Sequence, residues 1–392
     1  MAEVVTNGGV SVNELPFAQD RTRAWRELRE AGEVVVSGQE VILTSAAAVE
    51  LAAKAPETFS SARAFDRLGS PVPMIPIAID PPDHTRFRRI LDPFFGPKRM
   101  AEREAELRRQ ASELIDAIVA KGECDVVSDL ATPFPTQVFL TLFGLPLTDR
   151  DRLVRWKDAI LEFTDPGSVE PTPEVLTHAA ELFAYLTEHI SNRRSDTSGS
   201  DMLTALMTDT DAGAMTDIEL LGLCFMFVLA GLDTVTSAVG FALAKLATDT
   251  QLQTRVREDF SLIPAFIEDL LRVDGPVPFA PRVTTRDVVV ADQLIPKDTT
   301  VMMSYGSADR DPRRFQNPDD IDLDSRNVHF AFGRGPHRCL GSHLARLELR
   351  IILEEWHSRV GDYAVAPGGS PQVKWPAGTL TLNALPLKVK PA

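Results

Sequence analysis

The chain has 392 residues, of which 44% are hydrophobic and 25% are charged, a balance that argues against a disordered, collagenous or coiled-coil protein. Its 41 Lys and Arg residues against 56 Asp and Glu residues give a net charge of −15, which opposes general binding to nucleic acids or anionic membranes. The three cysteines lie far apart, so neither a disulfide framework nor a four-cysteine metal site is expected, and a reducing, cytoplasmic location is.

The first 20 residues lack the basic and apolar regions of a signal peptide and are expected to be poorly ordered. A short amphipathic helix is predicted over 21–31 and a β-hairpin over 34–43. Residues 61–82 contain one glycine and five prolines, which predicts a long irregular loop of the kind that usually has a function.

Helical periodicity covers most of the remaining chain, and strand-like runs are short and late. The predicted helical segments are 84–121, 136–143, 149–163, 173–194, 201–208, 216–248, 252–259, 262–273 and 341–358. The predicted strands are 287–290, 299–303, 372–374, 379–382 and 386–389. Because no repeat and no Gly/Ser-rich linker divides the chain, we predict a single domain over 1–392, mainly α with small β-sheets.

The apolar stretch 220–232 is the longest in the chain, at thirteen residues. As a helix it would be about 20 Å long, short of the roughly 30 Å of a bilayer core. It therefore predicts a buried helix of a globular protein with no membrane anchor.

The most informative segment is 332–341, which reads FGRGPHRCLG. Its glycines permit positive φ and close backbone approach, so a tight loop is expected. Helical periodicity begins at Ser342, so Cys339 lies just before a helix N-terminus, where backbone N–H groups and the helix dipole stabilise a thiolate. Such a sulfur can act as a nucleophile or as a metal ligand. The other two cysteines, Cys124 and Cys224, are expected to be packing residues.

The helix predicted over 216–248 contains AGLDT at 230–234. Gly231 costs about 1 kcal/mol relative to alanine in a helix. Burial of Asp233 and Thr234 is unfavourable unless both side chains find partners, and the threonine can bend the helix by bonding to the carbonyl four residues earlier. Three unfavourable choices in the most apolar helix favour a functional role over a packing role.

These two segments together resemble the cysteine loop and the distal helix of the cytochrome P450 family. The resemblance implies a triangular α-helical prism with a small β portion, haem b as cofactor and Cys339 as the thiolate ligand of its iron. It also implies that Ala230 and Gly231 let O₂ approach and that Asp233 and Thr234 relay protons. The implied activity is a monooxygenase that inserts one oxygen atom of O₂ into its substrate.

The segment HTRFR at 84–88 places His84 and Arg88 four residues apart, on one face of a helix. The resemblance implies that both bind haem propionates, as do Arg282 and His337. It completes the cofactor-binding set with Phe332, Gly333 and Cys339.

One motif departs from the family. Where relatives pair a glutamate with an arginine to brace the core, Arg272 is present but the acidic position holds Asp269, which is one methylene shorter. We therefore expect either that the pair shifts or that Glu268 substitutes. Arg326 is the expected third member of the brace.

The expected substrate pocket is almost entirely apolar, which favours a hydrophobic small molecule. Its predicted lining comes from the irregular loop, the distal helix, the segment after the brace and a C-terminal turn. The predicted residues are Phe65, Leu68, Val72, Met74, Ile75, Met226, Leu229, Val277, Pro278, Phe279 and Thr379.

Because the sequence has neither a flavin nor an iron–sulfur motif, the resemblance implies an external electron donor, a small ferredoxin supplied by a reductase. It would dock near Cys339, where basic side chains could form a local patch although the protein as a whole is acidic. The protein is expected to be a monomer. The expected patch residues are Arg86, Arg89, Lys98, Arg334, Arg338 and Arg346.

Three other functions compete with this interpretation. A peroxygenase driven by H₂O₂ is disfavoured by the acid-alcohol pair at 233–234, which such enzymes replace. A haem carrier or sensor would not need a proton relay or a long substrate loop. A helical binding protein without haem would leave the pattern around Cys339 unexplained.

Overall fold

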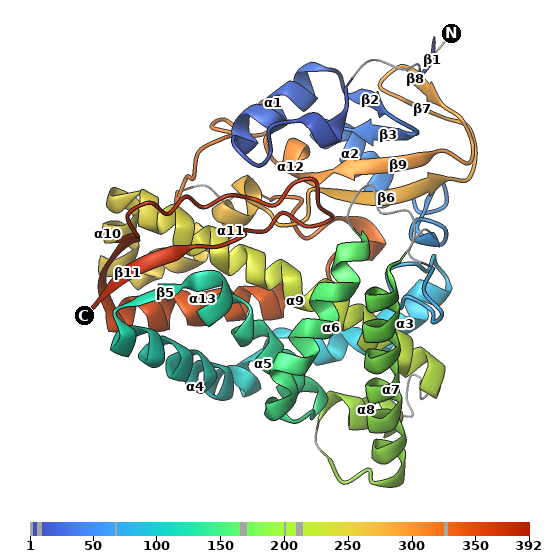
Figure 1. Ribbon diagram of the computed structural model, residues 1–392. Helices are drawn as coiled ribbons and strands as arrows, with labels where there is room; N and C mark the ends of the chain where they lie inside the picture. Colours follow the sequence, from blue (N-terminus) through green and yellow to red (C-terminus); the bar gives the residue numbers. More distant parts are fainter. Residues whose placement is uncertain are drawn as a thin grey trace.

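The computed structural model describes residues 3–5, 10–66, 69–164, 171–199, 201–208, 215–324 and 328–392, and helices predominate in it (Figure 1). The α-helices are α1 (Arg21–Glu30), α2 (Ala46–Lys54), α3 (Asp83–Leu91), α4 (Pro97–Lys121), α5 (Pro133–Phe143), α6 (Arg150–Thr164), α7 (Pro173–Ser195), α8 (Met202–Thr208), α9 (Asp217–Thr248), α10 (Thr250–Glu258), α11 (Ile263–Val273), α12 (Tyr305–Ala308) and α13 (Ser342–Arg359). The strands are β1 (Glu3–Val4), β2 (Val34–Ser37), β3 (Glu40–Leu43), β4 (Phe59–Ser60), β5 (Glu123–Asp125), β6 (Phe279–Thr284), β7 (Val288–Val290), β8 (Gln293–Ile295), β9 (Thr300–Ser304), β10 (Val360–Val365) and β11 (Pro386–Pro391).

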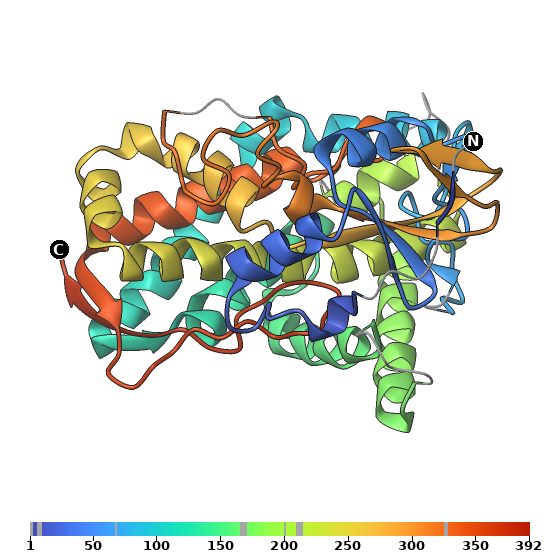
Figure 2. The ribbon, with the colours of Figure 1, turned by 90° about the horizontal axis from the view of Figure 1, so that it is seen from above.

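The central element is α9, which crosses the molecule beneath the sheets and is in contact with α5, α7, α11 and α13 (Figures 1 and 2). Its start was predicted correctly. The Thr216 hydroxyl accepts a bond from the N–H of Glu219, while the Glu219 carboxylate accepts one from the N–H of Thr216 at 2.8 Å. The helix has 32 residues, so it extends well beyond the apolar stretch 220–232 on which the expected length of about 20 Å rested. By length and composition it qualifies as a spanning helix, but just over half of its most apolar window is buried against the rest of the protein. It forms the core of this fold.

The predicted helix over 84–121 divides into α3, a short 3-10 turn over Asp92–Phe95, and α4. Pro93 and Pro97 cause the break, because proline cannot donate the backbone bond that a continuous helix needs. The break turns the chain, so α3 lies beside the Cys339 loop while α4 packs along α13. The other predicted helices are confirmed within a few residues at each end.

The strands form three small sheets above and beside the helices. The largest has the order β2-β3-β9-β6-β4, and within it the predicted hairpin pairs Val34 with Leu43. The two others have the orders β1-β8-β7 and β10-β11-β5. The fold class predicted from the sequence, mainly α with small sheets, is confirmed.

Several local predictions were wrong. Residues 10–20 were expected to be poorly ordered, but Phe17 is fully buried, with its ring 4.5 Å from that of Trp25 and 4.4 Å from that of Trp375. Helix α2 was missed because its alanine-rich sequence has little amphipathic contrast, although Ser45 caps it. Strand β6 was missed because Pro281 lies in its middle. The predicted strands 372–374 and 379–382 contribute a single bridge, between Val373 and Leu382.

Candidate functional site

The loop before α13 folds tightly around Cys339. Gly333 has a φ of +65° and donates its N–H to the carbonyl of Phe330 at 2.6 Å, while the N–H of Cys339 donates to the carbonyl of Phe332 at 2.7 Å. Gly335 has a φ of +66°, and a Cβ there would lie 2.1 Å from the carbonyl oxygen of Ala53. Only glycine fits both positions, so the two glycines of the sequence pattern are a steric requirement of this turn.

The Cys339 side chain is exposed, whereas Cys124 and Cys224 are buried. Desolvation by the surrounding protein raises the pKa of the Cys339 thiol. Opposing, smaller effects come from the N–H of Gly341 and from three guanidinium groups, those of Arg88, Arg338 and Arg346. Burial raises the pKa of both other thiols to about 12, and Cys339 is the exposed cysteine of the three.

Three predicted cofactor-binding side chains meet close to this loop. The rings of His84 and His337 lie 4.2 Å apart, and the Nε2 atom of each is buried with no hydrogen-bond partner among the described residues. Burial lowers the pKa of His84, and burial with the nearby Arg282 charge lowers that of His337 to about 3. Arg282 is 5% exposed, and its Nη1 donates to the carbonyl of the adjacent Pro281 at 2.6 Å.

Buried nitrogen atoms with few or no hydrogen-bond partners raise the free energy of the folded protein. Such nitrogen atoms are what an anionic group, such as a carboxylate, requires at a buried site. Arg88, the fourth predicted member, differs from the other three. It donates to the carbonyl of Arg338 at 2.6 Å and pairs with Asp92 at 2.8 Å, so it also ties α3 to the cysteine loop.

The segment 230–234 lies within α9, whose helical assignment continues through it without interruption. The Thr234 hydroxyl donates to the carbonyl of Ala230 at 2.9 Å, the backbone contact that the sequence analysis anticipated. Ala230 is exposed although most of its helix is buried, and a Cβ at Gly231 would meet no atom of the described residues within 4 Å. Open space therefore adjoins the helix at 230–231.

A lysine that was not predicted from the sequence contacts this segment. Lys157 of α6 is 3% exposed, and its Nζ lies 3.3 Å from Oδ1 of Asp233 and 2.5 Å from Oδ1 of Asp158. Burial alone would lower the pKa of Lys157, but the two carboxylates outweigh it and the net shift is upward. The signal in the sequence is the position of Lys157 on the apolar face of α6, between Leu153 and Ile160 at helical spacing.

We expect Lys157→Met to destabilise the protein by roughly 2–3 kcal/mol at neutral pH, because it leaves the Asp233 carboxylate in a largely buried place without its cation. The pKa of Lys157 is raised on folding, so the pair contributes fully at neutral pH and its contribution disappears only as the pH rises through that raised value. Chemical denaturation of the parent and the variant measures the difference.

The matched control is Lys245→Met in α9. Its Nζ also lies 3.3 Å from a carboxylate, that of Asp249, but both side chains of that pair are more than a third exposed. We expect this control to cost under about 1 kcal/mol. Equal losses in the two variants would show that burial of the Lys157–Asp233 pair is not what makes it matter.

The brace forms through Asp269 itself. Its two carboxylate oxygens bind Nε and Nη2 of Arg272 at 2.6 and 2.9 Å, and its Oδ2 also accepts the N–H of Asp322. Arg272 donates further to the carbonyls of Asp309, Asn317, Pro318 and Asp320.

Of the two alternatives left open by the sequence, substitution by Glu268 does not occur, and the predicted pair of Asp269 with Arg272 forms. The Glu268 side chain leaves α11 in a different direction from that of Asp269. Its carboxylate binds Arg346 at 2.5 and 2.7 Å and His329 at 3.2 Å. Arg326, the expected third member, lies outside the described residues.

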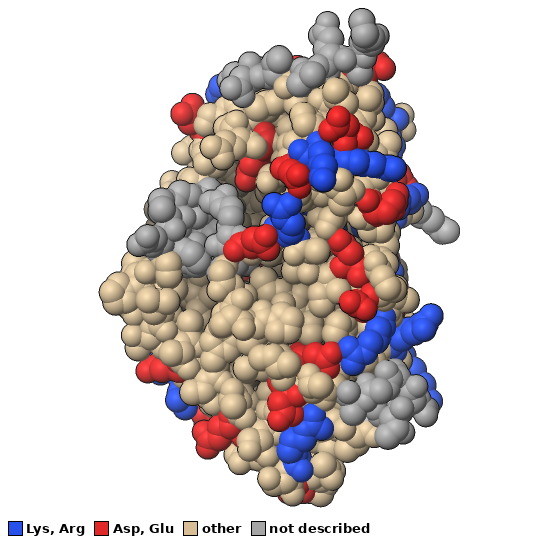
Figure 3. Space-filling view, turned by 90° about the vertical axis from the view of Figure 1, so that its right-hand side faces the viewer, with Lys and Arg blue, Asp and Glu red and all other residues tan. Residues whose placement is uncertain are grey.

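The predicted pocket residues are not all available to a ligand. Val72, Met74, Ile75, Met226 and Pro278 are buried, whereas Leu229 and Val277 are half-buried. The N–H of Leu380 donates to the carbonyl of Pro276 at 2.8 Å, which brings the half-buried Thr379 beside the segment 277–279. Phe65 and Phe279 are also half-buried, and Leu68 lies outside the described residues. The face of the molecule that carries α3 and the irregular loop before it has broad uncharged areas between scattered charged side chains (Figure 3).

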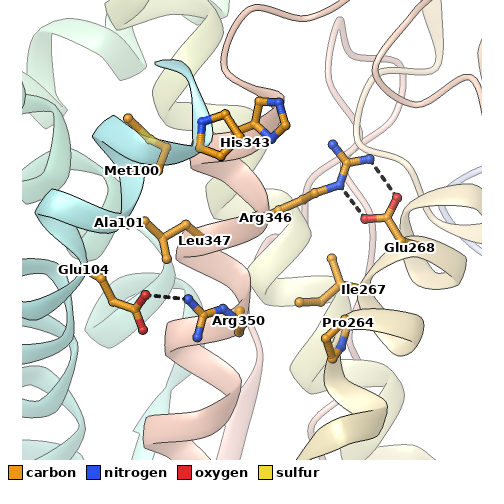
Figure 4. Close-up of a pocket in the computed structure, with 11 residues that line it drawn as sticks. Met100, Ala101, Glu104, Pro264, Ile267, Glu268, His343, Arg346, Leu347 and Arg350 are labelled. Carbon is orange, nitrogen blue, oxygen red and sulfur yellow. Dashed lines mark hydrogen bonds and ion pairs between the residues drawn. The ribbon is translucent and has the colours of Figure 1, made fainter. Parts of the chain in front are cut away.

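A separate pocket of about 290 Å³ lies between α4, α11 and α13 (Figure 4). It shares no residue with the predicted substrate pocket. Two ion pairs cross it, Arg346 with Glu268 and Arg350 with Glu104. Arg346 also lies 4.4 Å from the ring centre of Phe332, so this pocket borders the cysteine loop on the α13 side.

Comparisons with known proteins agree with this geometry. A sequence model described as Cytochrome P450 matches residues 36–357. The "Probable cytochrome P450 127A1" of Sinorhizobium fredii is 35% identical over 319 residues, which cover 80% of this chain and 75% of the relative. The "Mycinamicin IV hydroxylase/epoxidase" of Micromonospora griseorubida is 33% identical over 324 residues, covering 80% and 79%. Among solved structures, CYP109E1 from Bacillus megaterium in complex with testosterone superposes with a TM-score of 0.85 at 28% identity, covering 93% of this chain and 96% of that one.

Proposed function

The chain belongs to the cytochrome P450 family, whose relatives are monooxygenases with a haem-thiolate cofactor, and on that premise we propose that it oxidises a hydrophobic small molecule. The proposed cofactor is haem b, the proposed electron donor is a ferredoxin with its reductase, and the proposed location is the cytoplasm. The overall reaction is R–H + O₂ + 2e⁻ + 2H⁺ → R–OH + H₂O. When bound, the haem supplies the reductive activation of O₂.

The observation that carries the proposal is the group of unpartnered buried donors beside the exposed sulfur. Haem has one iron and two carboxylates, and this site offers one accessible thiol at Cys339 together with unsatisfied nitrogens on His84 and His337 and the buried charge of Arg282. The residues present therefore fit the group. In this assignment Cys339 Sγ holds the iron, the three nitrogen-bearing side chains hold the carboxylates, and Arg88 fixes the loop.

The residues of α9 would relay protons and leave room for the substrate. Ala230 and Gly231 leave open room beside the helix for O₂ and substrate. The Thr234 hydroxyl can donate a proton, and Asp233 can take one from solvent and pass it on. Lys157 holds the Asp233 side chain in place. Apolar side chains around this space bind the substrate and exclude water.

The testosterone bound by the Bacillus relative is an apolar molecule of the class we propose as substrate. A panel of steroids, fatty acids and macrolides, titrated into the holoprotein and followed by the optical spectrum, tests the substrate class. We expect at least one of these largely apolar compounds to shift the spectrum saturably, and a response only to small charged compounds without a hydrocarbon part would contradict the assignment. Extraction of the cofactor with acidified solvent tests for haem b, which is released because no covalent bond holds it.

Half of the expected docking patch is available for an electron donor. Arg89, Lys98 and Arg338 are exposed and have no ion-pair partner among the described residues. Arg86 and Arg346 are paired with Glu219 and Glu268, and Arg334 is half-buried over the Phe330 ring. The three available cations support docking of an acidic partner on the Cys339 side.

We expect Arg89→Glu to lower the second-order rate of reduction by a ferredoxin about tenfold at low salt, because it reverses a charge that guides encounter. Stopped-flow reduction at several salt concentrations measures the rate. The control is Arg255→Glu on α10, an exposed arginine at the opposite end of the molecule (Figure 1). Equal rates for both variants, or rates independent of salt, would contradict this docking site.

A further inference from the structure

Gly222 is buried in the N-terminal part of α9, eight residues before Ala230. A glycine inside a helix costs about 1 kcal/mol relative to alanine, so its presence in this long and largely apolar helix requires a reason. Neither the proton relay nor the cofactor site involves this residue. The reason lies in what packs against it.

The backbone of the loop 70–79 occupies the place where a side chain at 222 would stand. An ideal Cβ on Gly222 would lie 2.1 Å from the carbonyl oxygen of Pro73, 3.1 Å from its carbonyl carbon and 3.3 Å from its Cγ. The obstacle is mainly backbone, so it cannot rotate away as a flexible side chain could. Any residue other than glycine must push the loop away from α9 by roughly 1 Å.

The loop is held firmly in this position. Val72, Met74 and Ile75 are all less than 10% exposed, and Ile75 is 1% exposed. The Pro73 carbonyl that faces Gly222 accepts the N–H of Ile75 at 3.0 Å, and the N–H of Ala78 donates to the carbonyl of Met74 at 3.0 Å. The loop therefore has its own hydrogen bonds and buried anchors, and it meets α9 as a preformed unit.

A second contact, about one turn earlier in α9, joins that helix to α3, which follows the loop in the chain. Arg86, at the start of α3, pairs with Glu219 at 2.7 Å. Glu219 is also the residue that closes the N-terminal cap of α9. The first turns of α9 thus hold the chain on both sides of the segment 76–82.

The helical repeat relates this contact to the proposed substrate space. Positions four and seven residues apart lie on one face of a helix, so Gly222, Met226 and Leu229 share a face, with Ala230 at its border. The loop covers the N-terminal part of that face. The C-terminal part ends at the exposed Ala230.

We propose that Gly222 is a specificity-determining position, because the absence of a side chain there seats the loop 70–79 against α9 and closes the substrate space above Ala230. The size of molecule that this space admits, and how quickly it enters, then depend on the fit between Gly222 and Pro73. The inference rests on the proposed function, since it takes the space above Ala230 to be the substrate pocket.

The test is Gly222→Ala with Gly240→Ala as the matched control. Both glycines are buried in α9 and both changes gain the same helix propensity, but a Cβ at 240 would meet its nearest neighbour, Leu382 Cδ1, at 3.5 Å, an ordinary contact. The probes are imidazole and a phenyl-substituted imidazole, whose binding to the holoprotein is followed by stopped-flow absorbance. Hydrogen exchange of the Ile75 and Ala78 amides reports on the loop without any ligand.

In Gly222→Ala we expect the bulky azole to associate at least fivefold faster, imidazole to change less than twofold, and both amides to exchange at least tenfold faster. Gly240→Ala should match the parent in every measurement. Association and exchange rates in Gly222→Ala equal to those of the parent would overturn the inference. If the parent itself lacks thiolate-ligated haem, the proposed function fails, and the exchange measurement still decides whether Gly222 seats the loop.

A second variant protects the test against misfolding of the first. Ile75→Ala loosens the loop from its own side and leaves α9 untouched, so it should reproduce the faster entry of the bulky azole and the faster exchange at Ala78. If Gly222→Ala fails to bind haem, unchanged rates in Ile75→Ala overturn the inference.

Discussion

Cys339→Ser is expected to abolish monooxygenase turnover, with a loss of at least about a thousandfold, while the protein remains folded. The hydroxyl of serine has a far higher pKa than a thiol, so it does not provide the anionic sulfur on which this chemistry depends. The loop should survive the change, because it is held by backbone bonds and by Gly333 and Gly335, and Cys339 is exposed. Substrate-dependent consumption of O₂ with a reconstituted electron donor measures turnover, and circular dichroism checks the fold.

Cys124→Ala is the matched control for this substitution. Cys124 is buried on β5, and burial raises the pKa of its thiol to about 12, so it remains neutral and inert. We expect this variant to keep nearly all of the activity at a modest cost in stability. Turnover that survives in Cys339→Ser, or disappears equally in Cys124→Ala, would contradict the assignment of Cys339.

Thr234→Ala is expected to separate electron consumption from product formation. Loss of the hydroxyl bonded to Ala230 removes a proton donor beside the open space next to α9, so electrons should leave as peroxide while product per electron falls about tenfold or more. Peroxide and product, measured together against the electrons supplied, give the coupling ratio. An enzyme driven directly by peroxide would be little affected, so the same experiment separates the two activities.

The control is Thr248→Ala in the same helix. Its hydroxyl makes the same kind of bond, to the carbonyl of Ala244 at 2.8 Å, but it lies near the end of α9 at the surface. We expect unchanged coupling in this variant. A similar fall in both variants would point to a general effect on the helix, and an unchanged ratio in Thr234→Ala would remove Thr234 from the relay.

The parts of the site that follow from local chemistry could be predicted from the sequence. The turn at 332–341 was recognisable from its glycines. Gly333 and Gly335 both have a positive φ, and the backbone of Ala53 lies too close to Gly335 for a side chain. The start of α9 could be placed because a capping box is specified by residues three apart. The placement of His84 and Arg88 on one face of α3 followed from helical spacing alone.

What could not be predicted depends on contacts between distant segments. Lys157 and Asp233 are 76 residues apart, and the sequence around either residue does not indicate that the other is its partner. The choice between Asp269 and Glu268 was decided by the direction in which each side chain leaves α11. The role of Gly222 depends on Pro73, which reaches it only after the chain has folded.

The decisive experiment is the optical spectrum of the purified holoprotein, oxidised and then reduced under carbon monoxide. We predict a strongly red-shifted Soret band for the CO complex in the parent, and its loss in Cys339→His, which substitutes a neutral nitrogen ligand for the thiolate. A Soret band at the position of an ordinary histidine-ligated haem in the parent would contradict the assignment of Cys339 and with it the proposed monooxygenase.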